Sequence, residues 1–499
     1  MLSCWIQQLQ FATLALVLLT IVIRLPSLVH PRAIDDEAVY SVVANEIVDG
    51  GLPYRDAVER KPPLLFWTYA AIFRLAGKYN WYALHTVALL WTLCTMAGLY
   101  VIGRGLFDRK VGLIAALLYS IFQPWAHFTN LAFNGEMIMN LPIVWAWAIA
   151  FGQSSSRLRP ELAVAGALLC AAFLLKQPGA IAAVPLAIYL LLPSYRMSRG
   201  LTRVASVIQA GVLTAGFFTM LALIVIVLQT QGILRDAVYW TLGAQRIPHV
   251  FWQNGILATL AFIVACLPLI IGAVAALRDG QKTWTAKSAE RLALLGLLVA
   301  SAFGTAAGGR FYPHYYIQLV PPLALLAAPH LRAVFHRPTR RPLPRAAIFA
   351  WSALAVVSFT IAYWYELIPR RRPTKVGQYL AAHAGTNDRI FIWGRSAAQY
   401  YLDARRRPAC RYVVTFPLTG FIFGGPLPGI DTRRWITPGA WDDLEKDFTR
   451  HPPAYIADLY ATADSQYPIR DFAVLSTILA DDYRPVARIN DAIIYQRLR

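Results

Sequence analysis

The sequence predicts a polytopic α-helical membrane protein that ends in a small α/β domain. Of its 499 residues, 57% are hydrophobic and only 15% are charged. Long stretches, such as residues 11–23, 204–228 and 256–277, contain no Lys, Arg, Asp or Glu. A membrane-spanning helix needs about 20 apolar residues, and such runs recur too often here for a soluble core. The first run lacks an Ala-x-Ala cleavage site and is followed by Arg24, so we expect a retained anchor rather than a signal peptide.

The apolar runs predict about eleven membrane spans. The fifth and sixth runs are short, so they are open to a tilted or re-entrant arrangement. The predicted spans are residues 8–24, 82–103, 111–126, 135–152, 161–176, 178–193, 204–229, 254–277, 291–308, 314–330 and 346–366.

Basic residues in the short loops predict the orientation. With a cytoplasmic N-terminus, the inner loops carry most of the Lys and Arg residues, and the short outer loops carry only Lys176, Arg235, Arg246 and Arg310. This is the bias of the positive-inside rule. An odd number of spans then places the C-terminus outside. This orientation explains much of the net charge of +20, because most of the excess basic residues in the membrane part would face the anionic inner leaflet, so no nucleic-acid partner is expected.

The chain is expected to divide into a membrane domain, residues 1–368, and an extracytoplasmic α/β domain, residues 374–499. The second domain should alternate strands and helices, as small α/β domains do. It shows no catalytic motif, its Gly- and Pro-rich segment 420–438 is expected to be an ordered loop, and its lone Cys410 excludes an internal disulfide. The β-type runs are 389–393, 412–416, 454–457 and 492–496, and the helical stretches are 376–383, 397–404, 441–450 and 469–480.

The first outer loop, residues 25–80, carries the acidic candidates. Asp36, Tyr40 and Ile47 recur at helical spacing, so they are expected on one face of a short surface helix. A purely structural explanation is equally open. Asp35 is a good helix N-cap, and acids in a first turn stabilise a helix by about 0.3 to 1 kcal/mol.

Cations on the outer side form the second set of candidates. Lys61 precedes Pro62-Pro63 in the first loop, and Lys176 stands between the short fifth and sixth spans. A lysine at the outer end of a short apolar pair points to an anionic ligand, although snorkelling to water also explains it. Arg246 and Arg310 are flanked by aromatic residues and are equally well explained as interface anchors.

Three short motifs follow one another along the membrane part. They are Asp36-Glu37-x-x-Tyr40, Lys61-Pro62-Pro63-Leu64-Leu65-Phe66-Trp67 and Leu175-Lys176-Gln177-Pro178-Gly179. In order and spacing they resemble the Asp-Glu-x-x-Tyr, Lys-Pro-Pro-Leu-x-x-Trp and Thr-Lys-Gly-Pro segments of the superfamily of protein O-mannosyltransferases and aminoarabinose (ArnT-like) transferases. The resemblance leaves out the C-terminal domain. It implies a GT-C fold and transfer of a sugar from a polyprenyl phosphate on the extracytoplasmic side.

The resemblance also implies roles for single residues. Asp36 matches the family's catalytic base at the acceptor, and Glu136, at the outer end of the fourth span, matches a second acid. His314 and Tyr315 match a Pro-His-Tyr-Tyr segment, which slightly favours donor contacts over a structural hydrogen bond to a carbonyl.

Two departures from the family pattern limit what carries over. Val39 stands where relatives often have Arg, so ligand contacts of that arginine do not carry over. Arg60 stands where the aminoarabinose branch commonly has Glu, which argues against that sugar.

The chemistry itself needs a base for the incoming hydroxyl and cations for the leaving phosphate. Adjacent Asp35 and Asp36 diverge by about 100° on a helix and chelate poorly unless Glu136 or His314 joins them. We therefore expect no cofactor and no metal requirement, with a divalent cation left open. The expected catalytic residues are Asp36 and Glu136, and the expected substrate-binding residues are Glu37, Tyr40, Lys61, Lys176, Arg246, Arg310, His314 and Tyr315.

The functional prediction is an inverting glycosyltransferase of the bacterial inner membrane with an extracytoplasmic active site. Its donor would be a polyprenyl-phosphate sugar, and its acceptor lipid A or lipopolysaccharide, another envelope glycan, a glycolipid or a protein; the sugar is not fixed. The alternative is a lipid or sugar transporter or flippase. Such proteins carry ionisable residues at mid-membrane, whereas the charges of interest here gather at the outer ends of the spans.

Overall fold

Two units, each assembled from separate stretches of sequence, make up the protein in the computed structural model. The structure describes residues 2–32, 34, 36–125, 128–152, 158–244, 250–278, 284, 287–336, 343–368, 372–420, 431–460 and 467–498. The first unit comprises residues 1–31, 84–227 and 249–369, and the second comprises residues 32–83, 228–248 and 370–499. The first outer loop therefore belongs to the same unit as the C-terminal segment.

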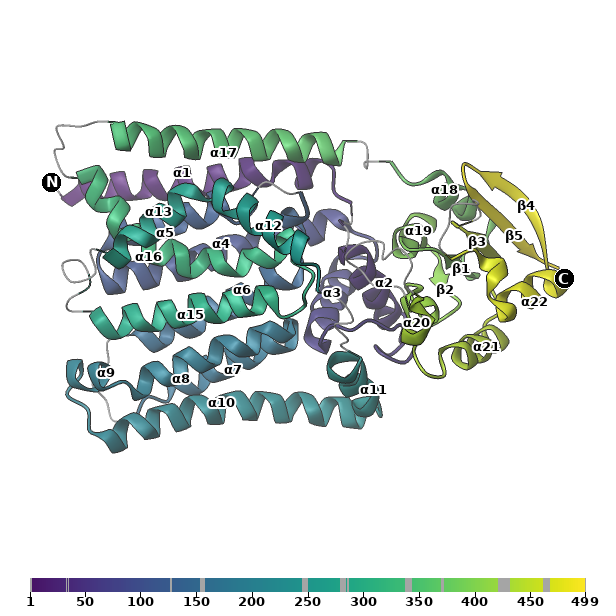
Figure 1. Cartoon of the computed structure of the whole chain (residues 1–499), viewed down its shortest axis with the longest axis horizontal. Helices are drawn as coiled ribbons and strands as arrows, with labels where there is room; N and C mark the ends of the chain where they lie inside the picture. Colours follow the sequence, from purple (N-terminus) through teal and green to yellow (C-terminus); the bar gives the residue numbers. More distant parts are fainter. Residues whose placement is uncertain are drawn as a thin grey trace. The chain divides into compact units, whose positions relative to one another are not determined.

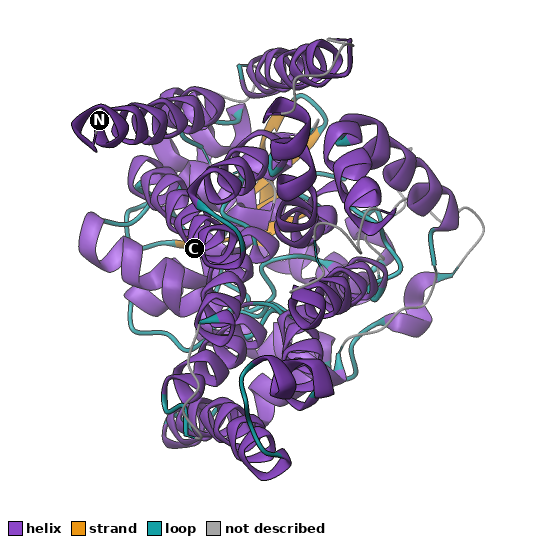
Figure 2. Cartoon of the chain, turned by 90° about the vertical axis from the view of Figure 1, so that its left-hand side faces the viewer, coloured by secondary structure: helices purple, strands orange, loops and turns teal. Residues whose placement is uncertain are grey.

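The first unit is a bundle of apolar helices. Its long helices share one main direction in Figure 1 and are seen nearly end-on in Figure 2. Neighbouring helices pack in pairs, among them α6 with α7, α13 with α16 and α1 with α17. The helices are α1 (Leu2–Val29), α4 (Trp81–Leu106), α5 (Arg109–Phe122), η1 (Phe128–Leu131), α6 (Gly135–Phe151), α7 (Glu161–Leu175), η2 (Gln177–Ala182), α8 (Ala183–Leu191), α9 (Pro193–Ser198), α10 (Arg203–Thr230), α12 (Trp252–Ala265), α13 (Leu267–Arg278), α15 (Ser288–Ala306), η5 (Pro313–Leu319), α16 (Val320–His336) and α17 (Leu343–Leu367).

The helices agree with the predicted class of a polytopic membrane protein. Within the described ranges, six helical segments are long and apolar enough to cross a membrane, and the α12–α13 pair makes up to seven. Helices α6, α7 and the η2–α8 segment are apolar but shorter. Each of the eleven predicted spans coincides with one of these helical segments, whereas the number of helices that cross the bilayer stays a prediction.

One predicted span is wrong as a continuous helix. Residues 254–277 form two helices, α12 and α13, which meet at an angle of 80°. The break lies at Cys266, two residues before Pro268. Proline lacks an N–H donor and disfavours helical geometry in the residue before it, so a new helix starts more readily here than the old one continues.

The second unit combines the first outer loop with the C-terminal α/β domain. In its five-stranded sheet the order is β2-β1-β3-β5-β4. Strand β1 pairs in parallel with β2 and β3, whereas β5 pairs antiparallel with β3 and β4. The elements are α2 (Asp36–Val48), α3 (Pro63–Ala76), α11 (Leu234–Val238), the π-helical turn η3 (Tyr239–Gly243), α18 (Lys375–His383), β1 (Arg389–Trp393), α19 (Ala397–Ala404), β2 (Arg407–Pro408), α20 (Phe416–Thr419), η7 (Thr432–Trp435), α21 (Ala440–Arg450), β3 (Tyr455–Asp458), η8 (Ile469–Asp471), α22 (Ala473–Asp482), β4 (Tyr483–Ile489) and β5 (Ala492–Arg497).

Most predicted elements of this domain are confirmed, and one is wrong. Residues 412–416 form no strand; they lead into the short helix α20, which begins at Phe416 with Pro417 in its first turn. Val413 and Val414 are buried all the same, so their apolar character reflects core packing rather than sheet pairing. Strands β2 and β4 were not predicted, because β2 is only two residues long and β4 is largely exposed.

Candidate active site

The predicted site residues fall into two groups, one in each unit. The first-loop group lies in the second unit and consists of Asp36, Glu37, Tyr40 and Lys61. The bundle group lies in the first unit and consists of Glu136, Lys176, His314 and Tyr315. Arg310 lies just before η5, within the bundle unit, whereas Arg246 and Asp35 lie outside the described residues.

Helix α2 places Asp36 and Tyr40 on one face, as the spacing predicted. The Tyr40 hydroxyl donates a hydrogen bond of 3.0 Å to Asp36 Oδ2, across one helical turn. Edge-to-face contacts with Phe66 and Tyr69 of α3 hold the Tyr40 ring in place. The ring that carries this hydroxyl is therefore packed against α3.

Glu37 has a structural contact at the start of the same helix. Its Oε2 accepts a hydrogen bond of 2.7 Å from the backbone N–H of Ile34, and the backbone N–H of Glu37 donates to the Ile34 carbonyl. Such reciprocal bonding satisfies backbone groups that a helix start otherwise leaves open. Glu37 is fully buried, and this hydrogen bond holds its carboxylate at the N-terminus of α2.

Tyr69 is a member of the first-loop group that the sequence did not reveal. Burial raises the pKa of its hydroxyl well above the ordinary value, and the neighbouring carboxylates of Glu37 and Asp36 raise it further. Tyr69 therefore stays protonated beside these acids. Its only sequence signal was an apolar helical pattern, which does not separate a core tyrosine from one that faces a carboxylate.

Lys61 stands at the entry to α3, where Pro62 and Pro63 fix the helix start. Its Nζ lies 5.8 Å from the centre of the Tyr40 ring and 3.7 Å from Glu59 Oε1. The Tyr54 hydroxyl donates a hydrogen bond of 2.8 Å to the Lys61 carbonyl. The lysine is thus brought beside the tyrosine that contacts Asp36, and its charge is only partly offset by Glu59.

The bundle group forms where three helix interruptions meet. Glu136 lies in the first turn of α6, Lys176 lies between α7 and η2, and His314 lies at the start of η5. Asn134 caps α6 by accepting a hydrogen bond of 3.1 Å from the backbone N–H of Met137. Gly135 leaves room for the lysine, because a Cβ there would come within 2.8 Å of Lys176 Cδ.

Opposite charges meet in this group away from water. Lys176 Nζ forms an ion pair with Glu136 Oε1, and the Glu136 side chain is only 1% exposed. Lys176 Nζ also lies 4.5 Å from the centre of the Tyr315 ring, and His314 Nε2 lies 3.9 Å from Glu136 Oε1. Among the described residues, Glu136 Oε2 has no hydrogen-bond partner. This second carboxylate oxygen is therefore available to accept a hydrogen bond from a ligand.

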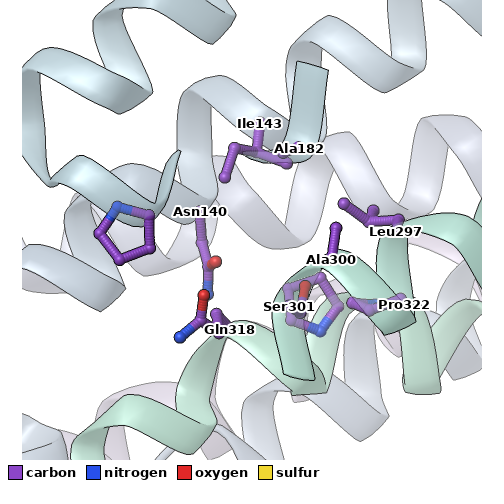
Figure 3. Close-up of a pocket in the computed structure, with 10 residues that line it drawn as sticks. Asn140, Ile143, Ala182, Leu297, Ala300, Ser301, Gln318 and Pro322 are labelled. Carbon is purple, nitrogen blue, oxygen red and sulfur yellow. The ribbon is translucent and has the colours of Figure 1, made fainter. Parts of the chain in front are cut away.

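A cavity lies one helical turn from this ion pair. Asn140 follows Glu136 by four residues on α6, so it lies one turn further along the same helical face, and Gln318 lies near the end of η5, the 3₁₀ segment that also carries His314. Their amide groups point toward each other in Figure 3, and both residues line the cavity. Asn140 donates to the Ile317 carbonyl at 3.3 Å, and Gln318 donates to the Tyr315 carbonyl at 2.9 Å. The cavity lining is Asn140, Ile143, Pro178, Ala182, Leu297, Ala300, Ser301, Gln318, Pro321 and Pro322.

Metal binding has no clear site in the described part of the chain. No group of three or more His, Cys, Asp and Glu side chains there is arranged to hold a metal ion. Asp35, one of the acids considered for such a site, lies outside the described residues. The metal independence expected from the sequence stays a prediction.

Comparisons with known proteins bear on the bundle and on the whole fold. Residues 60–223 match the family model described as dolichyl-phosphate-mannose-protein mannosyltransferase. This stretch includes Lys61, Glu136 and Lys176. No protein of curated function matches the sequence significantly.

The fold is similar to solved membrane enzymes along nearly the whole chain. Crystal structures of ArnT from Cupriavidus metallidurans match with TM-scores of 0.62 in the apo state and 0.58 with bound undecaprenyl phosphate. Each match has 13% identity and covers 99% of this chain and 98% of the other. The oligosaccharyltransferase of Archaeoglobus fulgidus in its apo form matches with a TM-score of 0.53 at 13% identity, over 90% of this chain and 69% of the other. At such identities the likeness shows a shared fold.

Proposed function

We propose that this chain, a protein of the GT-C fold superfamily of mannosyltransferases and ArnT-like transferases, transfers a sugar from a polyprenyl-phosphate donor to an extracytoplasmic acceptor. The observation that carries the proposal is the buried Glu136–Lys176 pair, with His314 and Tyr315 beside it, inside a helical membrane unit. Ionisable groups within such a unit are costly, and they mark substrate sites more often than structural ones. Structures of the same fold hold undecaprenyl phosphate and, in a second case, dolichol phosphate, which supports this class of donor.

The proposed reaction is a single displacement that inverts the sugar carbon. The acceptor hydroxyl oxygen bonds to the anomeric carbon while the bond from that carbon to the phosphate oxygen breaks. The hydroxyl proton passes to Asp36, and the bonding electrons leave with the phosphate, which gains negative charge. Glu136 positions the acceptor, and its unpaired Oε2 is suited to accept a hydroxyl hydrogen bond.

Lys61 and Lys176 are proposed to stabilise the leaving phosphate. A unit positive charge at about 4 Å from a unit negative charge contributes about 4 kcal/mol at an effective dielectric constant of about 20. Lys176 is already paired with Glu136, so the net gain from it is smaller. Lys61 is less fully compensated, because Glu59 lies 3.7 Å from its ammonium group. We therefore assign Lys61 the larger share of the electrostatic stabilisation of the leaving phosphate.

The same proposal includes the cellular setting and the ligand roles that remain. The protein would reside in a bacterial inner membrane with a cytoplasmic N-terminus, an external active site and no metal requirement. Tyr40 would orient Asp36 through its 3.0 Å hydrogen bond, and His314 and Tyr315 would contact the donor. Arg310 is proposed to bind the donor. Arg246 is proposed to bind the donor as well, on the basis of the sequence alone, because it lies outside the described residues.

Turnover by the purified protein tests the proposal. The wild-type chain in lipid nanodiscs is given polyprenyl-phosphate sugars and acceptor extracts, and the released polyprenyl phosphate is measured. We expect Asp36→Asn to remove turnover while donor binding stays intact, because the amide cannot take the acceptor proton. Near-normal turnover of Asp36→Asn would refute the role of Asp36. Movement of the donor across the bilayer without any release of the phosphate would instead support the transporter alternative.

A further inference from the structure

One short segment of the C-terminal domain contacts both the C-terminal part of helix α2, which carries the proposed base, and the chain just before this helix. This segment runs from α19 to β2, and we call it the α19–β2 segment, residues 397–408. Helix α2 and α19 pack against each other within the second unit. In one contact the segment supplies an arginine to an acid of α2, and in the other it supplies an acid to an arginine that precedes α2.

At the far end of α2, Glu46 is held by two arginines. Arg407 Nε donates to Glu46 Oε1 at 2.9 Å and Arg407 Nη2 donates to Oε2 at 2.6 Å, so the pair is bidentate. Arg389 Nη1 lies 3.7 Å from Oε2. The Glu46 side chain is only 2% exposed. A buried carboxylate of this kind is stable only with its partners in place, so it fixes the end of α2 to β1 and β2.

Just before α2, the charges are reversed. Arg32 Nη2 donates to Asp403 Oδ2 at 2.5 Å, and the Asp403 side chain is 6% exposed. Asp403 also accepts a hydrogen bond of 2.8 Å from the backbone N–H of Thr374. The acid is therefore fixed by its own domain. The arginine that reaches it stands four residues before Asp36.

We infer that Glu46 and Arg32 are positioning residues and that the α19–β2 segment is a clamp which sets the place of Asp36. Asp36 precedes Glu46 by ten residues, about 15 Å along a helix. Over that length a tilt of about 4° displaces the Asp36 end by about 1 Å, and a misplacement of that size costs up to about 100-fold in rate. The inference rests on the proposed role of Asp36, and it gives the C-terminal domain a part in catalysis through geometry.

The test uses the full-length protein with Glu46→Gln, Arg407→Met and the two combined. We expect kcat to fall about 10- to 100-fold in each single variant, with the KM for the donor unchanged. The double variant should lose no more than the worse single one, because both changes release the same contact. Arg407→Lys, which keeps the charge but loses the fork, should fall between wild type and Arg407→Met.

Arg411→Met is the matched control. Arg411 forms a bidentate pair with Asp447, at 2.9 and 2.8 Å, and its Nη1 lies 3.4 Å from Asp443 Oδ2, so among the described residues its ion pairs are with α21. This variant should lower the unfolding temperature and leave kcat unchanged. If Glu46→Gln and Arg407→Met behave in the same way as Arg411→Met, the residues are merely structural and the clamp is refuted.

Hydrogen exchange of α2 separates a failure of the clamp from a failure of the proposed function. In Glu46→Gln, the backbone amides of residues 36–48 should exchange faster than in wild type, whereas Arg411→Met should leave them unchanged. If wild type shows no turnover, the glycosyltransferase proposal fails and the exchange of α2 alone decides on the clamp. Unchanged exchange in Glu46→Gln would refute it.

Discussion

Replacing Lys176 by Met should destabilise the protein through the acid that it leaves behind. Glu136 is 1% exposed, and Lys176 is its ion-pair partner. Removing one member of a buried pair costs about 3 to 5 kcal/mol, because the remaining charge is neither solvated nor compensated. We take the lower end of this range, about 3 kcal/mol, as the smallest loss expected.

The double variant Glu136→Gln with Lys176→Met separates stability from activity. It removes both charges and keeps side chains of similar volume, so stability should return close to the wild-type level. Activity should not return, because the proposed acceptor contact and the phosphate cation are both missing. Glu136→Gln alone keeps the lysine charge buried beside Tyr315 and should be destabilised by a comparable amount.

Unfolding in detergent and turnover are measured side by side. About 3 kcal/mol corresponds to roughly a 150-fold change in the ratio of folded to unfolded protein, which denaturant titration resolves. If Lys176→Met has the same free energy of unfolding as wild type, the ion pair does not contribute to stability. If the double variant turns over substrate normally, the pair has no role in the reaction.

Two further changes test the surroundings of the site and the pH response of the C-terminal domain. Gly135→Ala should lower kcat without preventing folding, because the added Cβ would come within 2.8 Å of Lys176 Cδ and must displace the lysine side chain. Steady-state kinetics would measure this effect. The control is Gly105→Ala, because a Cβ at Gly105 meets no atom within 4 Å. Burial raises the pKa of Asp458 to about 6, against about 3.9 in an unfolded chain. The contribution of Asp458 to the stability of β3 should therefore be largest below about pH 4. As the pH rises to about 6 and above, β3 should lose at most about 3 kcal/mol of stability. Asp458→Asn should abolish this loss, which hydrogen exchange of residues 455–458 at pH 4.5 and 7.5 would detect; a pH dependence equal to that of wild type would contradict the assignment.

The sequence predicted the bundle well because hydropathy is a property of each segment by itself. The eleven apolar runs coincide with helical segments for that reason. The bend at Cys266 was missed, since a proline near the middle of an apolar run is compatible with a kinked span as well as with two helices. Strand β2 could not be predicted from the sequence, because it is identified as a strand only by its parallel pairing with β1.

For the site, the sequence identified residues but not their partners. Helical spacing predicted the Asp36–Tyr40 contact, which is local. Glu136 and Lys176 are 40 residues apart, and the topology could place them only on one side of the membrane. The sequence did not indicate the contacts of Tyr69 and Glu46, because a buried tyrosine and a glutamate in a helix are ordinary in composition. Their roles depend on contacts with other elements of the second unit.

The interruptions in the helices explain why the bundle can hold an ion pair at all. A continuous helix satisfies its own backbone groups and presents side chains only from its sides, whereas a helix that stops exposes backbone N–H or C=O groups that need polar partners. Three such interruptions, at Asn134–Gly135, Lys176–Gln177 and Tyr312–Pro313, lie around Glu136, so this part of the apolar unit is unusually polar. The α6 start also offers a partial positive charge, which stabilises a carboxylate in the first turn by about 0.3 to 1 kcal/mol. If the helices were continuous at these points, both the polar surroundings of Glu136 and the space for the Lys176 side chain would be lost. Gly135 and the prolines at the starts of η2 and η5 are therefore as necessary to the site as Glu136 and Lys176 are.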